Sequence, residues 1–183
     1  MKINGKFVYL KNISLDDVFF VYKLRQNKLI SYYLHNPPKT LKDQKNWTKK
    51  NIKDKRTKDF IIISKKKNKK IGTIAFNNIS SNDAEWGRWI SKGNAIHNIE
   101  AVILLLNYGF KKLKFKKIYS LTNINNKKVI NFQKNTPALY AGIIKSLFII
   151  KNKKTDAVKY SFNQKNFSKF KKNFYFMTRS IQL

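Results

Sequence analysis

A glycine-containing turn stands directly before a long segment with apolar residues at helical spacing; it reads Lys92-Gly93-Asn94. Free amides at the start of a helix, with the positive end of the helix dipole behind them, attract phosphate groups. A glycine here lets the backbone approach phosphate closely, and Lys92 adds a mobile positive charge. The sequence therefore predicts a phosphate-binding loop around position 93.

The elements on either side of this loop are predicted from the spacing of apolar residues. A helix is expected over about 95–113, and a strand over 84–90 leads into the loop. Alternation along the strand places four residues on one face: Ala84, Trp86, Arg88 and Ile90. The loop is therefore expected between a strand and a buried helix.

The remaining segments predict a mixed α+β domain. Ahead of the loop we expect a strand over 7–13, a helix over 15–25, a helix from Thr40, and a hairpin of 60–64 with 71–77. The residues expected on or near the buried side of the first helix are Val18, Phe19, Tyr22 and Leu24. After it come a strand over 118–122, a helix over 125–134, and strands over 140–150 and 157–162. This order predicts one domain over 1–183 with a mainly antiparallel central sheet flanked by helices. Its core is expected over about 6–162, and 163–183 as a basic tail with a helix over 166–173.

The composition excludes several classes of protein. Forty basic and nine acidic residues give a formal charge of +31, but 42% of the chain is hydrophobic, which excludes a disordered polycation. The absence of cysteine excludes disulfides, thiolate nucleophiles and cysteine-bound zinc. Only His35 and His97 are available as histidine ligands, which argues against a metal site.

The basic charge has two interpretations. Only Arg25, Arg56, Arg88 and Arg179 are arginines, and the other 36 cations are lysines. Proteins that recognise nucleic acids favour arginine over lysine. A genome that drifts toward A- and T-rich codons explains the lysine-rich composition without a specific nucleic acid partner. The alternative is a polyanion-binding protein. No targeting segment is visible and the longest apolar run, 101–106, is far short of the roughly 20 residues of a membrane span. We expect a cytoplasmic monomer or homodimer.

The order of elements over about 6–162 resembles the GNAT superfamily of acyl-CoA-dependent N-acyltransferases, as does the segment Ala84-Glu85-Trp86-Gly87-Arg88-Trp89-Ile90-Ser91-Lys92-Gly93-Asn94-Ala95. That family binds the cofactor pyrophosphate between its fourth strand and the following helix. The resemblance implies acetyl-CoA (coenzyme A) as cofactor. It implies these contacts with it: Ile90, Ser91, Lys92, Gly93, Asn94, Ala95, Ile96, His97, Asn98 and Asn126. For two of these an alternative stays open, since His97 can be satisfied by a neighbouring carbonyl and Asn126 can be an ordinary helix cap.

The chain also departs from the family pattern. In the loop only Gly93 and Ala95 are small, and the tyrosine that often protonates the departing thiolate corresponds to Gln133. Gln133 can hydrogen-bond the thioester sulfur but cannot act as an acid. The chain is most similar to polysaccharide-associated members with a tryptophan-rich fourth strand and an atypical phosphate loop.

The resemblance also assigns the catalytic and acceptor-binding candidates. Glu85 is the candidate general base, because the fourth strand lies beside the reacting carbonyl and flanking tryptophans would raise its pKa; the alternative is a surface carboxylate paired with lysine. Acceptor contacts are expected from His35, Asn36, Trp86 and Arg88. Simple alternatives are a turn around His35, a core position for Trp86 and a surface ion pair for Arg88.

The expected function is transfer of acetyl from acetyl-CoA to a primary amine of a small-molecule amine acceptor. An amino sugar on a nucleotide-sugar intermediate of polysaccharide biosynthesis is the favoured acceptor. The alternatives are a protein N-terminal or ribosomal-protein acetyltransferase, and a non-catalytic module that binds CoA or polyanions.

Overall fold

The computed structural model describes residues 1–33, 37–150 and 152–181. The strands are β1 (Lys2–Asn4), β2 (Val8–Asn12), β3 (Lys58–Ser64), β4 (Lys69–Asn77), β5 (Asp83–Ser91), β6 (Lys117–Asn123), β7 (Leu139–Ile150) and β8 (Lys153–Phe162). The helices are α1 (Val18–Gln26), α2 (Lys28–Ser31), α3 (Leu41–Lys53), α4 (Ala95–Lys111), α5 (Lys127–Lys134) and α6 (Gln164–Met177), and a 3₁₀ turn covers Leu15–Asp17.

The described strands form one sheet in the order β1-β2-β3-β4-β5-β6-β8-β7. Neighbouring strands are antiparallel except β5 and β6, which are parallel. Helix α4 connects these two strands, as a crossover between parallel strands requires. The predicted mixed α+β fold with a mainly antiparallel sheet is confirmed.

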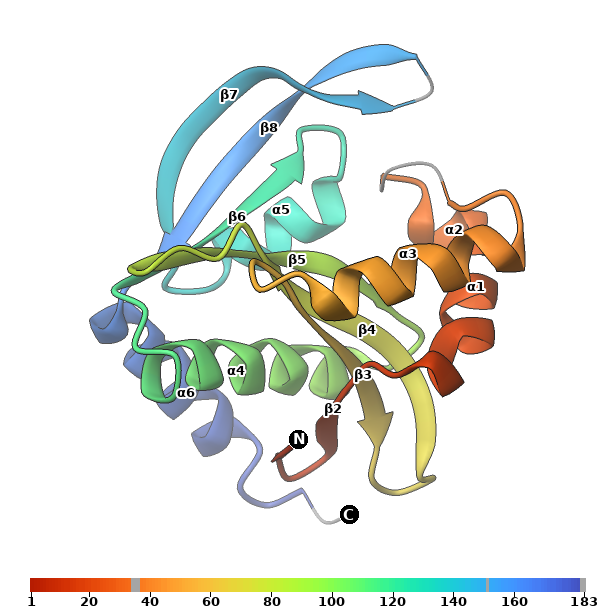
Figure 1. Cartoon of the computed structure of the whole chain (residues 1–183). Helices are drawn as coiled ribbons and strands as arrows, with labels where there is room; N and C mark the ends of the chain where they lie inside the picture. Colours follow the sequence, from red (N-terminus) through yellow and green to blue (C-terminus); the bar gives the residue numbers. More distant parts are fainter. Residues whose placement is uncertain (34–36, 151, 182–183) are drawn as a thin grey trace.

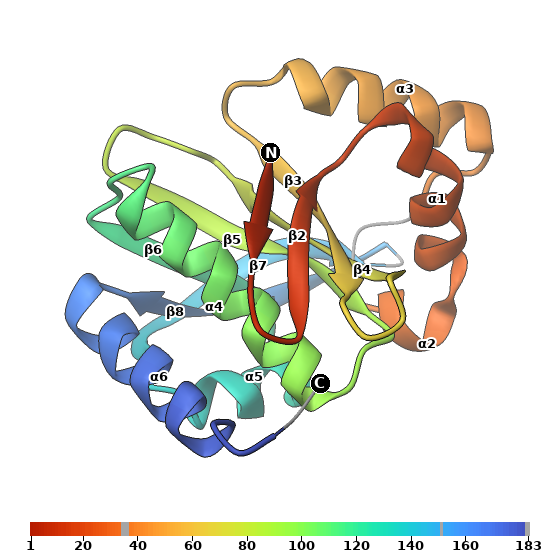
Figure 2. The same cartoon turned by 90° about the horizontal axis from the view of Figure 1, so that it is seen from below.

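Helices cover both faces of the sheet (Figure 1). Helices α1 and α3 lie on one face, over β3 and β4, while α4 and α6 lie on the other, as the view from below shows (Figure 2). The main core lies between the sheet and α4, whose residues 100–106 are all buried. Hairpin β7–β8 extends beyond the end of β6, so part of it projects past the sheet (Figure 1).

The first helix buries a different set of side chains from the one predicted. A capping box forms before it, with the Ser14 amide donating to the Asp17 carboxylate at 2.9 Å. However, the chain turns first as a 3₁₀ helix, which has 3.0 residues per turn, and this rotates the α-helical positions that follow. The expectation that Phe19 is buried is therefore wrong: its side chain is 61% exposed, and Val21 is buried instead.

The segment after residue 162 contributes to the core. It contains α6, which is longer than the helix expected over 166–173. Phe167, Phe170 and Phe174 recur at spacings of three and four residues, so they lie on one face of α6, and all three are buried. Phe167 stacks on Phe110 of α4 with ring centroids 5.3 Å apart.

Candidate active site

The sheet opens between its two parallel strands. Strands β5 and β6 are in register from Asp83 opposite Lys117 to Glu85 opposite Tyr119, and the pairing ends there. Beyond this point β5 pairs only with β4, and β6 only with β8. A cleft of about 290 Å³ occupies the opening and is lined by both strands and by α5. The edge of β5 in this cleft is free to bond an extended, amide-bearing molecule.

A β-bulge in β5 divides its side chains between the two faces of the sheet. Ala75 lies opposite Gly87 but Thr73 lies opposite Ile90, so β5 has one extra residue between these pairs. Arg88 takes up the extra length with a φ of +48°, and the Thr73 hydroxyl donates to its carbonyl at 3.1 Å. The expectation that Trp86, Arg88 and Ile90 share a face is therefore wrong.

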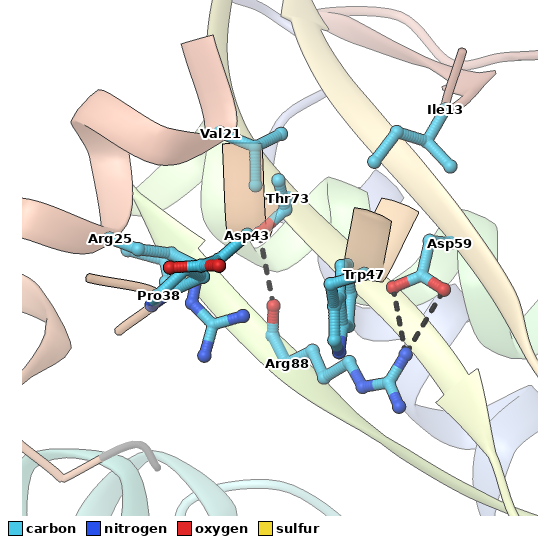
Figure 3. Close-up of a pocket in the computed structure, with 10 residues that line it drawn as sticks. Ile13, Val21, Arg25, Pro38, Asp43, Trp47, Asp59, Thr73 and Arg88 are labelled. Carbon is cyan, nitrogen blue, oxygen red and sulfur yellow. Dashed lines mark hydrogen bonds and ion pairs between the residues drawn. The ribbon is translucent and has the colours of Figure 1, made fainter. Parts of the chain in front are cut away.

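A second cavity lies on the α1 and α3 face, and Arg88 points into it (Figure 3). Ile90 also lines this cavity. The volume of the cavity is about 530 Å³. Arg88 Nη1 pairs with Asp59 at 3.1 Å and donates to Asn51 Oδ1 at 3.0 Å. The guanidinium groups of Arg88 and Arg25 lie 5.0 and 5.5 Å from the centre of the Trp47 ring. Burial raises the pKa of Asp59, and Arg88 acts against this shift.

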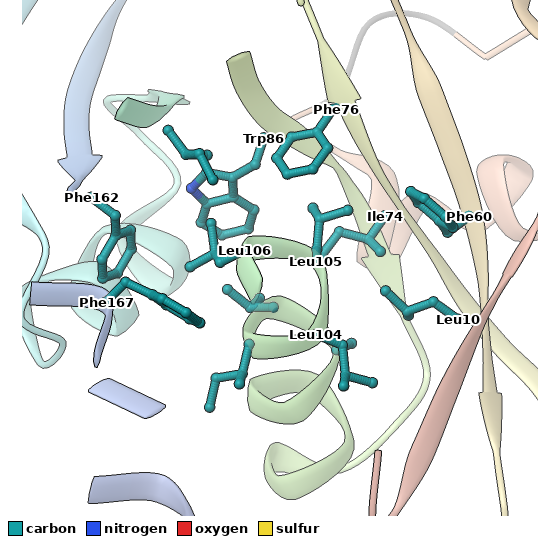
Figure 4. Packing of buried hydrophobic residues seen from close by; sticks show 14 of the residues in the cluster. Leu10, Phe60, Ile74, Phe76, Trp86, Leu104, Leu105, Leu106, Phe162 and Phe167 are labelled. Atoms are coloured by element: carbon teal, nitrogen blue, oxygen red, sulfur yellow. The ribbon is translucent and has the colours of Figure 1, made fainter. Parts of the chain in front are cut away.

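Trp86 points to the other face, into the core beside α4 (Figure 4). It is buried, its ring centroid lies 5.7 Å from that of Trp89, and both tryptophans also line the cleft. The indole Nε1 of Trp89 and the side-chain oxygen of Asn77 are buried without a hydrogen-bond partner among the described residues. These two cleft residues can therefore bond a bound molecule.

Glu85 lies at the closed end of the cleft, where the pairing of β5 with β6 ends. Its carboxylate accepts a hydrogen bond from Asn78 Nδ2 at 2.9 Å. Burial raises the pKa of Glu85, while the Asn78 bond and the charges of Arg88 and Lys159 oppose the rise. A carboxylate in this setting is suited to accept a proton.

The loop before α4 leaves two backbone donors open. Ser91 accepts from the Gly93 amide at 2.9 Å, and Asn94, the N-cap, accepts from the His97 amide at 3.0 Å. Within the described chain, no protein acceptor is found for the amides of Ala95 and Ile96 at the first turn. Open amides at the start of a helix, with the helix dipole behind them, are groups that can bond an anion, and the predicted phosphate-binding role of this loop stays a prediction.

Three other predicted residues have identifiable contacts. His97 Nε2 lies 3.5 Å from Ser64 Oγ, and burial lowers the pKa of His97. Asn126 lines the cleft and caps α5 by accepting from the Val129 amide at 3.3 Å. Gln133 is buried, with its Oε1 3.1 Å from Ser120 Oγ and its Nε2 3.0 Å from Thr122 Oγ1. Gln133 therefore connects α5 to β6 beside the cleft.

The sequence matches a family model described as an acetyltransferase (GNAT) domain over residues 8–135. The chain belongs to the GNAT acetyltransferase family. Membership makes the protein an N-acetyltransferase with acetyl-CoA as donor, as the resemblance implies. No curated protein matches the sequence significantly.

Solved GNAT structures share the fold of this acetyltransferase. A GCN5-related N-acetyltransferase from Brucella melitensis has a TM-score of 0.83 at 18% identity, with 95% of this chain and 83% of that chain covered. FdhC in its apo form, a nucleotide-linked sugar GNAT, has a TM-score of 0.78 at 21% identity, covering 95% and 96%. A spermidine N-acetyltransferase from Vibrio cholerae in complex with CoA and spermine has a TM-score of 0.79 at 19% identity, covering 90% and 99%.

The site of this GNAT acetyltransferase includes residues that the sequence analysis did not single out. Asp59 and Trp47 line the second cavity with Arg88. Asn51 accepts a hydrogen bond from Arg88, and Asn78 donates one to Glu85. The spacing of these residues forms no motif. The one signal in the sequence is the rarity of arginine among the cations, and it points to Arg25 and Arg88. His35 and Asn36, the other expected acceptor contacts, lie outside the described residues.

Proposed function

We propose that this GNAT acetyltransferase acetylates a primary amine of a small molecule, with an amino sugar on a nucleotide-sugar intermediate of polysaccharide biosynthesis as the favoured acceptor. The observation that carries the proposal is the cleft between β5 and β6, with Glu85 at its closed end and open amides at the start of α4. FdhC, a nucleotide-linked sugar GNAT, shares the fold, so the fold is compatible with this acceptor class. We propose a cytoplasmic enzyme that acts as a monomer or homodimer.

The chain's residues fit acetyl-CoA, which supplies an activated acetyl group when bound. The loop and first turn at residues 90–98 would hold its pyrophosphate, through the Ala95 and Ile96 amides and the Lys92 charge. The open edge of β5 would bond the amide-bearing arm, and Asn126 would contact it from α5. The partnerless Trp89 Nε1 in the cleft is a further donor for this arm.

Glu85 would receive the proton from the acceptor amine, directly or through water. An amine attacks a thioester only in its neutral form, and a base with a raised pKa accepts the proton more readily than an ordinary carboxylate. Gln133 would orient the sulfur by a hydrogen bond but supplies no proton. The sulfur therefore leaves as a thiolate, which a thiol of modest pKa allows, or takes its proton from water.

Calorimetric titration with acetyl-CoA at low and high salt, with ATP as a polyanion control, tests the donor site. Saturable binding that survives high salt and exceeds ATP binding supports the proposal. Binding that salt abolishes, with ATP bound equally, is the behaviour of a polycation alone and contradicts it. Acetylation of amino-sugar nucleotides, followed by thiol release, then tests the acceptor.

A further inference from the structure

The 530 Å³ cavity on the α1 and α3 face contains an unusual concentration of arginine. Two of the chain's four arginines, Arg25 and Arg88, line it, although 36 of the 40 cations are lysines. Composition alone would place lysine at these positions. The planar guanidinium differs from lysine in presenting a fork of donors that matches phosphate and carboxylate oxygens.

Arg88 has donors to spare for a ligand. All of its side-chain hydrogen bonds to described residues leave from Nη1, toward Asp59 and Asn51. The donors on Nε and Nη2 are left over, and the side chain remains 35% exposed. Arg25 lies on the other part of the cavity wall, with Trp47 between the two guanidinium groups (Figure 3).

The acidic residues of this cavity are already committed to protein partners. Asp59 is paired with Arg88 and also accepts from Asn51 Nδ2. Asp43 accepts from the Thr40 amide at 3.0 Å in the capping box of α3. Asp43 keeps its negative charge there, because Thr40 is a neutral partner, whereas the charge of Asp59 is compensated by Arg88. An anionic group would find its hydrogen-bond donors at the two guanidinium groups.

The cavity communicates with the reaction site through Arg88, which lines both it and the cleft that holds Glu85. A molecule with its anionic part beside Arg25 and Arg88 can thus extend its amine toward Glu85. The cavity volume falls within the range of about 300–1,000 Å³ that is typical of small-molecule sites.

We propose that this cavity is the acceptor's anion subsite, in which Arg25 and Arg88 bind phosphate or carboxylate groups, foremost the diphosphate of a nucleotide-linked acceptor. This inference rests on the proposed function and specifies its substrate class. It separates the enzyme from polyamine acetyltransferases, because the same two side chains repel a polycation.

The test is a titration of the CoA-saturated protein at high salt with uridine diphosphate, succinate or spermidine. CoA occupies the phosphate loop of α4, and salt suppresses adhesion of polyanions to the basic surface. Arg25→Lys and Arg88→Lys keep the charge but remove the fork, and the matched controls Arg56→Lys and Arg179→Lys alter exposed arginines outside the cavity.

We expect uridine diphosphate to bind and each cavity variant to weaken it about tenfold, the loss of one charge-assisted hydrogen bond. Arginine-dependent binding of succinate instead would assign the site to a carboxylate and still support an anion subsite. Saturable binding of spermidine, or equal affinity of all four variants for the anions, would overturn the proposal. Arg25→Lys keeps the Arg88–Asp59 pair, so the test stands if Arg88→Lys unfolds the protein.

Failure of this inference differs from failure of the proposed function. Acetyl-CoA affinity is measured first, on the same proteins before CoA is added, and its absence in the unaltered protein contradicts the function itself. The anions are then titrated into an Ala95→Glu background, in which a carboxylate at the start of α4 weakens any binding of anions at the phosphate loop. Arginine-dependent binding there would show an anion site without a donor site.

Discussion

Arg88 and Asp59 form an ion pair, with Nη1 3.1 Å from Oδ2, at the point where the bulge of β5 faces the second cavity. The pair joins β3 to β5 across β4, which lies between them in the sheet. Asp59 is 8% exposed at its side chain, so its charge depends on Arg88 for compensation. The bulge that separates the cleft from the cavity is therefore tied electrostatically to β3.

We expect Arg88→Met to destabilise the protein by about 2–3 kcal/mol at neutral pH, since it leaves a buried carboxylate unpaired. The pKa of Asp59 is already above its ordinary value of 3.8, and loss of Arg88 raises it further. A carboxyl whose pKa is raised by folding stabilises the protonated native state, so stability falls as pH rises through that pKa. Denaturant unfolding of both proteins at several pH values checks this.

The double variant Asp59→Asn/Arg88→Met is the control for this prediction. With no carboxyl at position 59, the pH dependence of the difference should disappear and part of the lost stability should return. If Arg88→Met lowers the free energy of unfolding equally at acid and neutral pH, Asp59 is not the group that causes the loss of stability.

Glu85→Gln should lower kcat/KM about a hundredfold or more near neutral pH, the usual contribution of a general base. The acidic limb of the wild-type pH profile should lie above the ordinary glutamate pKa of 4.5, because burial raises the pKa of Glu85. Activity rises through this limb as the base ionises, so the variant's deficit grows with pH. A profile for Glu85→Gln that keeps the limb would remove Glu85 from the mechanism.

Asn78→Gly tests the assignment of the acidic limb of the pH profile to Glu85 in a second way. Asn78 donates to the Glu85 carboxylate and has a φ of +47°, a conformation that glycine adopts without strain. Loss of its hydrogen bond should raise the pKa of Glu85 and move the limb toward higher pH. An unmoved limb with a lower plateau would instead mean that Asn78 acts on the acceptor.

The fold could be predicted from sequence because most elements have clear periodicity. Ile96, Ile99 and Val102 mark α4 at helical spacing, and the runs 60–64 and 71–77 mark a hairpin. The bulge could not be predicted, because a pattern of alternation assumes that no residue is inserted into the strand. One extra residue at Arg88 moves the side chains that follow it to the opposite face of the sheet. The phase of α1 was missed for a similar reason, since a 3₁₀ turn precedes it.

The cleft and the second cavity differ in how far sequence reveals them. Glu85 and the loop at 90–98 are continuous in the chain, so one motif indicates them. Arg25, Trp47, Asp59 and Arg88 come from two helices and two strands, and only the folded sheet brings them together. The one signal in the sequence, the rarity of arginine, applies to Arg25 and Arg88, and it becomes informative only when both are seen to meet at the ring of Trp47.

Ala95→Glu should weaken acetyl-CoA binding about tenfold through repulsion between the new carboxylate and the phosphates. Ala95 is exposed at the first position of α4, where a carboxylate favours the helix, so stability should not fall. This separates it from Gly93 substitutions, whose Cβ would lie 2.9 Å from both His97 Cβ and Ile71 Cδ1. Calorimetric affinity and thermal unfolding measure the two effects.

The matched control for that variant is Gln164→Glu, which places the same charge at the first position of α6. It should leave acetyl-CoA affinity unchanged. If both variants weaken binding equally, the effect arises from net charge alone, and the phosphate loop is not at the start of α4.

Gln133→Leu should cost about 2 kcal/mol of stability, because it leaves the buried hydroxyls of Ser120 and Thr122 without their partner. The triple variant with Ser120→Ala and Thr122→Val removes all three polar groups and should recover most of this loss. Because the triple variant keeps α5 packed on β6 without an amide at position 133, its kcat at a temperature well below unfolding reports the role of Gln133 in acyl transfer. A kcat reduced about tenfold in the restored protein would assign Gln133 to the departing sulfur, whereas a wild-type kcat would make its contact with β6 purely structural.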